Sequence, residues 1–418
     1  MKKVVKKIAL LLIVFGIGVG VTLLYTNNKY KVYEEEEPKQ IKKHVDTISM
    51  MLETEAKSGN YELTTASSWP TDGYKFNSEL SKCEHGSELS WDDTNKRVVM
   101  SGNKSDKCYV YFDMIPPVLL ADYVKSLYTG IQGDNNIYYH DSSLTNGAGD
   151  SSYRYSGANP NNYVCFGSTV SPCPTDNLYR IIGVFENQVK LIKYDYATST
   201  LLGTDGDYQG TGTPDASYYK GSLATIDRYY WNNSIGNNTW SESLLNKTNL
   251  NANFITNIGT EWAQKIATTT WKVGGNISSN IYSKTPSVAY QNEIVAPEPS
   301  STSTTGETEY TAKIGLMYVS EYGFAADPNA WTTTLTYYDK SVDGSTIRSL
   351  NWMYMGYYDW TISRDAGNSG YAFYVDGDGY VDGYGVTHSI GVRLSFILES
   401  VITYVSGDGT QNSPIIIN

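Results

Sequence analysis

The segment YRIIGVF (residues 179–185) is followed by the polar residues ENQ (186–188) and then by VKLIKY (189–194). Two short runs that are rich in β-branched and aromatic residues, separated by a few polar residues, are typical of a β-hairpin. The segment therefore predicts a pair of antiparallel strands within the longest folded region of the chain.

Residues 130–418 around this hairpin are predicted to form one large α+β domain. Strand-like runs return toward the C-terminus, at residues 314–319, 360–363, 371–384 and 391–398. Apolar residues recur at a helical period at Leu244, Leu245, Phe254, Ile258, Trp262 and Ile266. This pattern favours two short amphipathic helices, with Thr260 as the N-cap of the second. We expect Trp360, the hairpin at 371–384 and the strand at 391–398 to share one antiparallel sheet, with these helices beside it and the last strand in a central position.

Residues 61–115 are predicted to form a small β-rich unit. Residues 89–100 indicate two strands around an Asp/Asn turn, and residues 108–112 indicate a third strand. Pro116-Pro117 marks the end of the unit, and residues 116–129 are expected to form a short connecting helix.

The N-terminal residues predict a membrane anchor. Residues 1–7 carry four lysines, and residues 8–25 are an uncharged, largely apolar run about long enough to cross a bilayer as a helix. Because the lysines precede the run, residues 1–7 are expected in the cytoplasm and the bulk of the chain outside the cell. The alternative is a cleaved secretory signal, but the run does not end in an Ala-x-Ala cleavage site.

Residues 26–60 are expected to form a stalk and a helix. Four glutamates at residues 34–37 are followed by Pro38, which indicates an extended, solvated chain. Helical spacing then relates Ile41, Val45, Ile48 and Leu52. This spacing predicts a helix that packs on the next unit.

Four cysteines, Cys83, Cys108, Cys165 and Cys173, lie beyond the predicted anchor. In an oxidising exterior an even number indicates disulfides, and their order suggests Cys83–Cys108 and Cys165–Cys173, although four cysteines permit three pairings. The alternatives are free thiols or a metal site. A zinc site of four cysteines would need paired C-x-x-C motifs, which the sequence lacks.

Several blocks of the chain carry a resemblance to a known group of proteins. They are SYRYSGANPN (152–161), DNLYRIIG (176–183), NKSDKCYVYF (103–112), NWMYMG (351–356), WTISR (360–364), YAFYV (371–375), DGYV (378–381) and GVR (391–393). This set resembles membrane-anchored surface proteins of low-GC Gram-positive bacteria, a group for which no activity is established. The resemblance implies a location at the cell surface and covers most of the predicted exterior.

A looser resemblance is to C-type-lectin-like folds of the formylglycine-generating type. Those folds end in a Trp-rich strand, an Asn-rich loop with an exposed aromatic residue, and a closing Gly-[Phe/Val]-Arg strand, an order that Trp360, residues 371–384 and residues 391–393 follow. The resemblance implies that Arg393 bridges loop carboxylates or carbonyls. The formylglycine-generating enzymes need two cysteines late in the domain, and this chain has none after Cys173. It therefore resembles a relative of that fold without its chemistry.

No residue set indicates catalysis or a cofactor. The four histidines have no metal-ligand spacing, and His140-Asp141 is not accompanied by a G-x-S-x-G motif, so His140 is expected in a surface loop. A glycosidase pair of carboxylates remains open, because nothing singles out one pair among many acidic residues.

A calcium site is a weak candidate at Asp376, Asp378 and Asp382. These carboxylates occupy positions 1, 3 and 7 of a calcium-loop pattern, which then lacks the glycine at position 6 and the glutamate at position 12. The alternative is a β-hairpin whose turn contains Asp378-Gly379.

The chain contains 37 tyrosines, a residue that provides large contact area at low entropic cost. We expect a ligand-binding surface built from Tyr354, Tyr357, Tyr358, Tyr374, Tyr380 and Tyr384, unless part of this set belongs to the core of a sheet. Together with the anchor, this surface predicts an extracellular recognition or adhesion protein whose partner is a glycan or a cell-surface protein. A surface enzyme acting on glycan or cell wall, or a structural envelope protein, are the alternatives. The net charge of −12 argues against nucleic acid as a partner.

Overall fold

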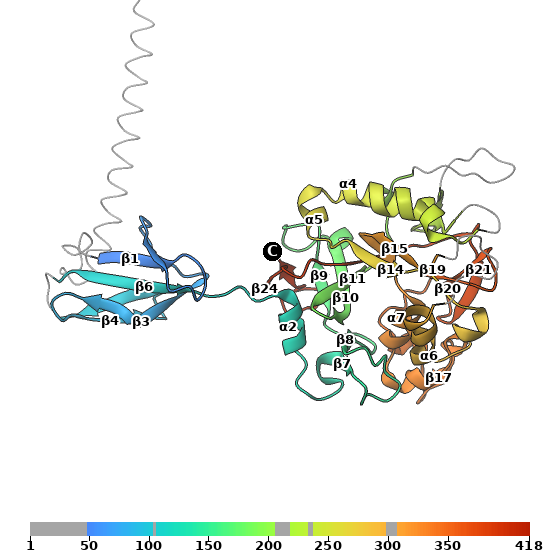
Figure 1. The fold of residues 1–418 in the computed structure, drawn as a ribbon, viewed down its shortest axis with the longest axis horizontal. Helices are drawn as coiled ribbons and strands as arrows, with labels where there is room; N and C mark the ends of the chain where they lie inside the picture. Colours follow the sequence, from blue (N-terminus) through green and yellow to red (C-terminus); the bar gives the residue numbers. More distant parts are fainter. Residues whose placement is uncertain (1–47, 103–105, 205–217, 233–236, 298–306) are drawn as a thin grey trace, which may run out of the picture. The chain divides into compact units, whose positions relative to one another are not determined.

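The computed structural model describes residues 48–102, 106–204, 218–232, 237–297 and 307–418. The chain divides into two compact units, Met1–Pro117 and Val118–Asn418, which are described separately (Figure 1). Both units are rich in strands and contain few helices, so the protein is of the mixed α+β class.

The small unit is built on a four-stranded sheet in the order β2-β1-β6-β3. Its strands are β1 (Ile48–Glu53), β2 (Tyr61–Leu63), β3 (Tyr74–Cys83) and β6 (Cys108–Met114), and a separate hairpin is formed by β4 (Glu88–Asp92) and β5 (Arg97–Ser101). The predicted hairpin and third strand are thus confirmed. The core contains Met50, Val110 and Phe112, and Phe112 packs against the rings of Phe76 and Trp91.

The helix predicted to include Ile48 and Leu52 is wrong at these two residues. Both lie in β1, which pairs in parallel with β6, so that Ile48 lies beside Cys108 and Leu52 beside Phe112. Ile48, Met50 and Leu52 also alternate at the strand period of two, and Met50 is buried. Over so few residues the helical and the strand periods of hydrophobic residues cannot be told apart. Pairing with the distant strand β6 decides that the segment is a strand.

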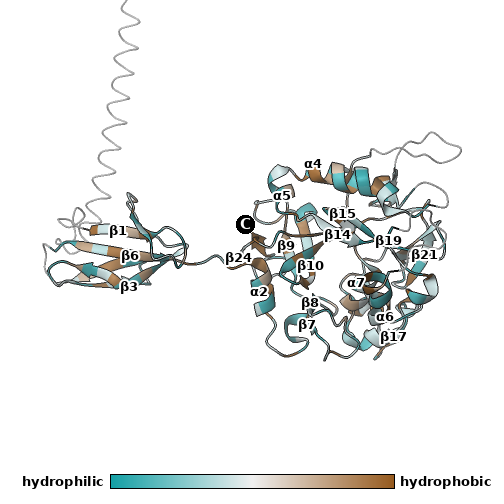
Figure 2. Ribbon diagram, viewed as in Figure 1, coloured by the Kyte–Doolittle hydropathy of each residue, from teal (hydrophilic) through white to brown (hydrophobic). Residues whose placement is uncertain are grey.

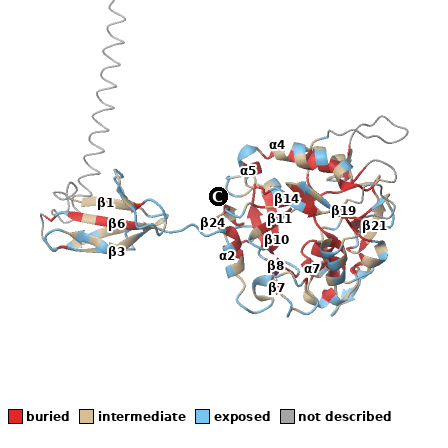
Figure 3. Ribbon diagram, in the orientation of Figure 1, coloured by how far each residue is buried: buried red, intermediate tan, exposed pale blue. Residues whose placement is uncertain are grey.

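The large unit contains a seven-stranded, antiparallel sheet in the order β16-β23-β11-β10-β8-β7, with β9 also paired to β10. These strands are β7 (Ile137–His140), β8 (Ser152–Tyr155), β9 (Tyr163–Cys165), β10 (Leu178–Phe185), β11 (Gln188–Lys193), β16 (Ile314–Leu316) and β23 (Leu394–Ile397). The hairpin β10–β11 predicted from the sequence is confirmed and lies in the middle of this sheet. Buried residues are concentrated on its strands (Figure 3).

The C-terminal hairpin forms a different sheet from β23. Strands β19 (Asp359–Arg364), β20 (Tyr371–Val375) and β21 (Val381–Gly385) make a three-stranded sheet, and β23 pairs with β11 and β16. The expected single sheet is therefore wrong, although the central position of β23 is confirmed. An isolated bridge, Asp359 to Gly391, links β19 to the segment just before β23.

Further short sheets complete the large unit. They are formed by β12 (Tyr219–Leu223), β13 (Ile226–Tyr230) and β22 (Ser389–Ile390), by β14 (Thr269–Lys272) and β15 (Glu309–Ala312), by β17 (Ser341–Val342) and β18 (Ser345–Thr346), and by β24 (Tyr404–Ser406) and β25 (Ile416–Ile417).

Helix α2 (Leu120–Ser126) occupies the predicted connecting segment. Leu120, Ala121 and Val124 are buried in the core of the large unit, so this helix belongs to that unit. The helix that begins as a π-helix, η6 (Leu245–Phe254), continues as α4 (Ile255–Asn257) and carries hydrophobic residues interrupted by hydrophilic ones (Figure 2).

The N-cap of α5 (Thr260–Gln264) is Gly259, and Thr260 is the first residue of the helix, which corrects the predicted cap. Gly259 has a φ of +86°, a conformation that ends one helix and starts the next and that glycine adopts without strain. The remaining helices are α3 (Ser199–Leu202), α6 (Pro286–Tyr290), η8 (Gln291–Val295) and α7 (Val319–Ala325), with single turns at η3 (Asp134–Asn136), η4 (Thr175–Asn177), η5 (Trp240–Glu242), η7 (Ser278–Asn280), η9 (Pro328–Thr332), η10 (Leu335–Tyr337) and η11 (Ile347–Leu350).

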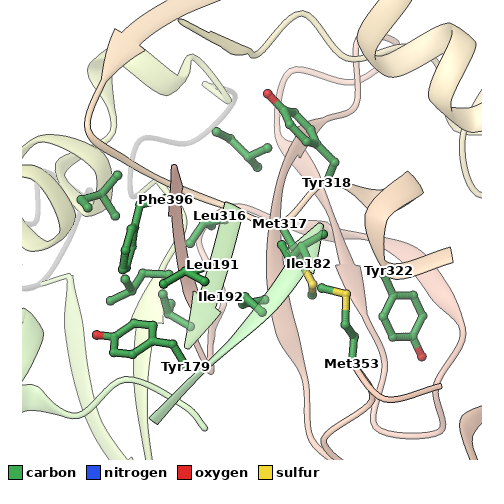
Figure 4. Close-up of a cluster of buried hydrophobic side chains, with 14 of the residues drawn as sticks. Tyr179, Ile182, Leu191, Ile192, Leu316, Met317, Tyr318, Tyr322, Met353 and Phe396 are labelled. Atoms are coloured by element: carbon green, nitrogen blue, oxygen red, sulfur yellow. The ribbon is translucent and has the colours of Figure 1, made fainter. Parts of the chain in front are cut away.

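The core of the large unit lies on both faces of the seven-stranded sheet. On one face Leu191 is in register with Phe396, whose ring contacts Phe254 of η6. Figure 4 shows Leu191 and Phe396 together, and Met317 beside Met353. The helices predicted over residues 241–266 thus pack in the same unit as the C-terminal strands.

Both disulfides have the predicted connectivity, Cys83–Cys108 and Cys165–Cys173, and no free cysteine remains. Among the described residues, no helix combines the length and the apolar character needed to cross a bilayer. The predicted anchor at residues 8–25 lies outside the described residues.

Candidate functional site

A partly enclosed pocket of about 310 Å³ lies on one face of the seven-stranded sheet. Its floor is a row of residues across neighbouring strands: Arg154 of β8 is opposite Gly183 of β10, Gly183 is opposite Lys190 of β11, and Lys190 is opposite Ile397 of β23. Residues that lie opposite one another on paired strands project to the same face. The row therefore places two cationic side chains and one apolar side chain under a single pocket.

Gly183 is required for this floor. A β-bulge lies between Ile181 and Gly183, and a Cβ atom on Gly183 would clash with the carbonyl oxygen of Tyr153 on β8. Only glycine lets β8 approach β10 this closely. The close approach brings Arg154 beside the central hairpin.

Four aromatic side chains line the pocket. Lys190 Nζ lies 4.7 Å from the ring centroid of Trp271 and 4.5 Å from that of Tyr318. The guanidinium of Arg154 lies 4.7 Å from the ring of Phe185 and 5.4 Å from that of Tyr290. Each cation is therefore held over the faces of two rings that line the pocket, an arrangement that is strong where water is excluded.

Lys190 also forms an ion pair with Glu321, on the first turn of α7. Lys190 Nζ lies 2.6 Å from Glu321 Oε1, and both side chains are 4% exposed. The second oxygen, Oε2, accepts the backbone N–H of Tyr318 at 2.9 Å. Burial lowers the pKa of Lys190, and the charge of Glu321 opposes this shift. The ion pair thus offsets part of the cost of burying the ammonium group.

Arg154 is paired with Asp150 in a comparable way. Arg154 Nη2 donates to Asp150 Oδ2 at 2.5 Å, and Nε donates to the Ser152 hydroxyl at 2.8 Å. Burial raises the pKa of Asp150, but the charge of Arg154 and hydrogen bonds from Ser152 outweigh it and bring the pKa to about 2. Asp150 is therefore ionised at neutral pH.

Glu293 of η8 lies next to the pocket and has the most perturbed carboxyl group of this region. Its oxygens accept the backbone N–H groups of Val319 and Ser320 at 2.8 and 2.9 Å, and it also accepts the Ser363 hydroxyl. Burial raises its pKa to about 7, although the N–H donors act in the opposite direction. Glu293 thus fixes the start of α7, which carries Ser320 and Glu321 into the pocket wall.

None of the pocket's charged residues was among the predicted site residues. A signal did exist, because Lys190 interrupts an apolar strand, and a charged residue within such a strand requires a buried partner. Its partner Glu321 is 131 residues away in the chain, and no local pattern relates the two.

The predicted tyrosine surface is a packed aromatic cluster. Tyr374 is 7% exposed and is a core residue, and the other five tyrosines are half-buried. Ring contacts join Tyr357 to Tyr358, Tyr358 to Tyr374 and Tyr374 to Tyr384, with centroids 5.0–5.7 Å apart. Tyr354 donates to the carbonyl of Gly377, and burial raises the pKa of Tyr380 to about 12.

The calcium candidate is a hairpin turn. Asp376 Oδ1 accepts the N–H of Asp378, Asp378 pairs with Arg348 at 3.1 Å, and Asp382 accepts the N–H of Gly383. The turn is closed by a hydrogen bond from Gly379 N to the Asp376 carbonyl. Within the described ranges, no group of three or more His, Cys, Asp or Glu side chains is arranged to hold a metal ion.

His140 is buried, which corrects its expected place in a surface loop. It lies at the end of β7, its Nδ1 accepts the N–H of Ala148 at 3.1 Å, and its ring contacts Phe324 and Trp331. Burial lowers its pKa well below the usual value. It is a neutral core histidine.

Arg393 has the bridging contacts that the lectin-like resemblance implies. Its Nε donates to Asp359 Oδ2 at 2.5 Å, its Nη2 donates to the Met353 carbonyl at 2.6 Å, and both members of the ion pair are 2% exposed. The contacts join the segment before β23 to β19 and to the loop that precedes it.

No protein-family model matches the chain, no curated protein is detectably similar to it in sequence, and no solved structure is similar to it in fold.

Proposed function

We propose that this chain is a membrane-anchored, extracellular recognition protein whose large unit binds a small polar ligand in the pocket above β11. The pocket carries this proposal, because aromatic walls with a few fixed polar groups are the usual composition of ligand sites, and its volume of about 310 Å³ suits a ligand of monosaccharide size. The two disulfides support an exterior location, since such bonds persist in oxidising compartments.

The large unit is proposed to be a relative of C-type-lectin-like domains. The support is the order of β19, the hairpin β20–β21 and the Gly391-Val392-Arg393 segment, together with the Arg393–Asp359 bridge. In this chain β21 and β23 belong to different sheets, whereas the resemblance led us to expect them in one sheet.

Binding is favoured over catalysis by the state of the carboxylates. Both oxygens of Asp150, Glu293 and Glu321 already accept hydrogen bonds from the protein. A general base or a nucleophile needs an oxygen that reaches the substrate. Arg154 and Lys190 are instead held in ion pairs with Asp150 and Glu321, which suits recognition.

A glycan-array screen of the full-length chain in detergent tests the proposal. Thr270→Trp adds bulk at the exposed rim of the pocket, and Thr311→Trp makes the same change at its cross-strand partner, which does not line the pocket. We expect glycan binding by the wild type and by Thr311→Trp, and its loss in Thr270→Trp. No bound glycan, or equal binding by both variants, would refute the proposal, and release of reducing ends from a bound glycan would indicate the enzyme alternative.

A further inference from the structure

The pocket contains hydrogen-bond donors that the protein itself does not satisfy. Across the described residues, Lys190 Nζ makes one hydrogen bond, to Glu321, and Arg154 Nη1 makes none. An ammonium group has three N–H donors and each guanidinium Nη has two. These atoms are therefore the positions at which a ligand's acceptors can add hydrogen bonds.

The two incomplete donors lie close enough to serve one ligand group. Arg154 and Lys190 are on the same face of the sheet with only Gly183 between them, so their Cα atoms are about two strand spacings, roughly 10 Å, apart. Both side chains are long, and the charge of Arg154 acts on the ammonium of Lys190. Gly183 contributes no side chain to separate them.

We infer that the pocket binds an acidic sugar, a hexuronic acid residue, with its single carboxylate between Arg154 Nη1 and Lys190 Nζ. This inference rests on the recognition function proposed above. The sugar ring would lie along the aromatic walls, where apolar C–H faces of sugars pack, and its hydroxyls would meet the polar rim formed by Thr269 and Thr270.

The charges that line the pocket balance, so a ligand with more than one negative charge is disfavoured there. Asp150 and Glu321 already match the charges of Arg154 and Lys190. A phosphate monoester would bring a second charge without a counter-ion into a partly buried site.

The experiment measures binding of defined monosaccharides to the full-length protein by ligand-observed NMR and calorimetry. The probes are D-galacturonate, D-glucuronate, D-glucose and glucose 6-phosphate. We expect both uronates to bind with a Kd in about the millimolar range, as ligand size suggests, and the other two to bind at least ~10-fold more weakly.

Lys190→Met/Glu321→Gln removes both members of the ion pair and leaves the pocket neutral. We expect this variant to lose uronate binding by at least ~10-fold. Lys193→Met is the matched control, because it removes a buried lysine from the same strand on the opposite face, away from the pocket. It should bind uronate like the wild type. If circular dichroism shows that the double variant is unfolded, Arg154→Lys gives the same test, since it keeps the charge and removes Nη1.

The outcomes separate the acidic-sugar inference from the proposed recognition function. Equal binding of glucose and the uronates, or tighter binding of glucose 6-phosphate, would overturn the acidic-sugar inference and leave recognition standing. Unchanged uronate binding by the folded pocket variants would place the acidic-sugar site elsewhere and also overturn the inference. No binding of any probe, together with an empty glycan array, would refute both proposals.

Discussion

Lys190 and Glu321 form a buried ion pair that joins the central strand of the large sheet to the first turn of α7. The two residues come from segments 131 positions apart, and each is also fixed locally, Lys190 by aromatic rings and Glu321 by the N–H of Tyr318. The pair is therefore part of the framework of the pocket as well as part of its surface.

Removing one member of this pair should be far more costly than removing both. Lys190→Met leaves a buried carboxylate without its counter-ion and should lower the free energy of unfolding by about 3–5 kcal/mol. Lys190→Met/Glu321→Gln should restore most of this loss, because the amide oxygen of the substituted side chain can still accept the N–H of Tyr318. Denaturant unfolding followed by tryptophan fluorescence measures both, and additive losses would contradict the pairing.

Glu293 should make stability depend on pH below neutrality. Burial raises its folded pKa from the usual 4.5 to about 7, so the folded protein binds more protons than the unfolded chain between these values. The free energy of unfolding should fall as the pH rises through this window, by on the order of 3 kcal/mol. Glu293→Gln should be less stable at low pH and should lack this slope. Parallel pH profiles for the wild type and the variant would show that Glu293 titrates normally.

The two disulfides should contribute unequally because they close loops of different length. The bridged residues are 25 positions apart for Cys83–Cys108 and 8 for Cys165–Cys173. In the chain-entropy view, double replacement by serine should destabilise the small unit by about 3.5 kcal/mol and the large unit by about 2.5 kcal/mol. Calorimetry of the two variants against the wild type gives both values, and the reverse order would argue against loop entropy as the cause.

Replacing Tyr384 by alanine should destabilise the large unit. Its ring contacts Tyr374 at 5.0 Å and His388 at 4.1 Å, so truncation removes packing and should cost about 2 kcal/mol. Tyr371→Ala, on an exposed neighbour, is the control and should have little effect on stability. A binding defect in Tyr384→Ala without loss of stability would instead place recognition on the tyrosine surface.

The anchor predicts that the C-terminus is outside the cell. Protease added to intact cells should remove a tag placed after Asn418, because the lysines of residues 1–7 precede the apolar run. Lysed cells and a cytoplasmic marker protein provide the controls. A tag that is protected in intact cells and cleaved after lysis would contradict this topology.

Local elements of the fold were predictable, and their partners were not. The hairpins β4–β5 and β10–β11 have short loops and strongly strand-forming residues, so the information lies within about 15 neighbouring residues. The assignment of β23 to the sheet of β11 depends on pairing across about 200 residues, which no local pattern encodes. For the same reason local spacing predicts a helix at Ile48 and Leu52. These residues form a strand because they pair with β6.

The pocket was beyond local reasoning because it joins residues from six separate segments. Arg154 and Lys190 come together only through the bulge at Gly183, and Glu321 reaches them from α7. The predicted tyrosine surface, in contrast, rests on the abundance of tyrosine and on nearby glycines, and both features are equally compatible with packing. A charged residue within an apolar strand was the more informative signal.

The parallel pairing of β1 with β6 determines how the small unit responds to tension. The chain enters β1 at Ile48, beside Cys108, and leaves β6 at Met114, beyond the other end of β1. Pulling the chain apart at Ile48 and Met114 therefore slides the two strands lengthwise past each other. Their hydrogen bonds then carry the load together, whereas a hairpin pulled at its open end loses its bonds one at a time. The small unit thus has the geometry of a mechanically resistant link between Ile48 and Met114.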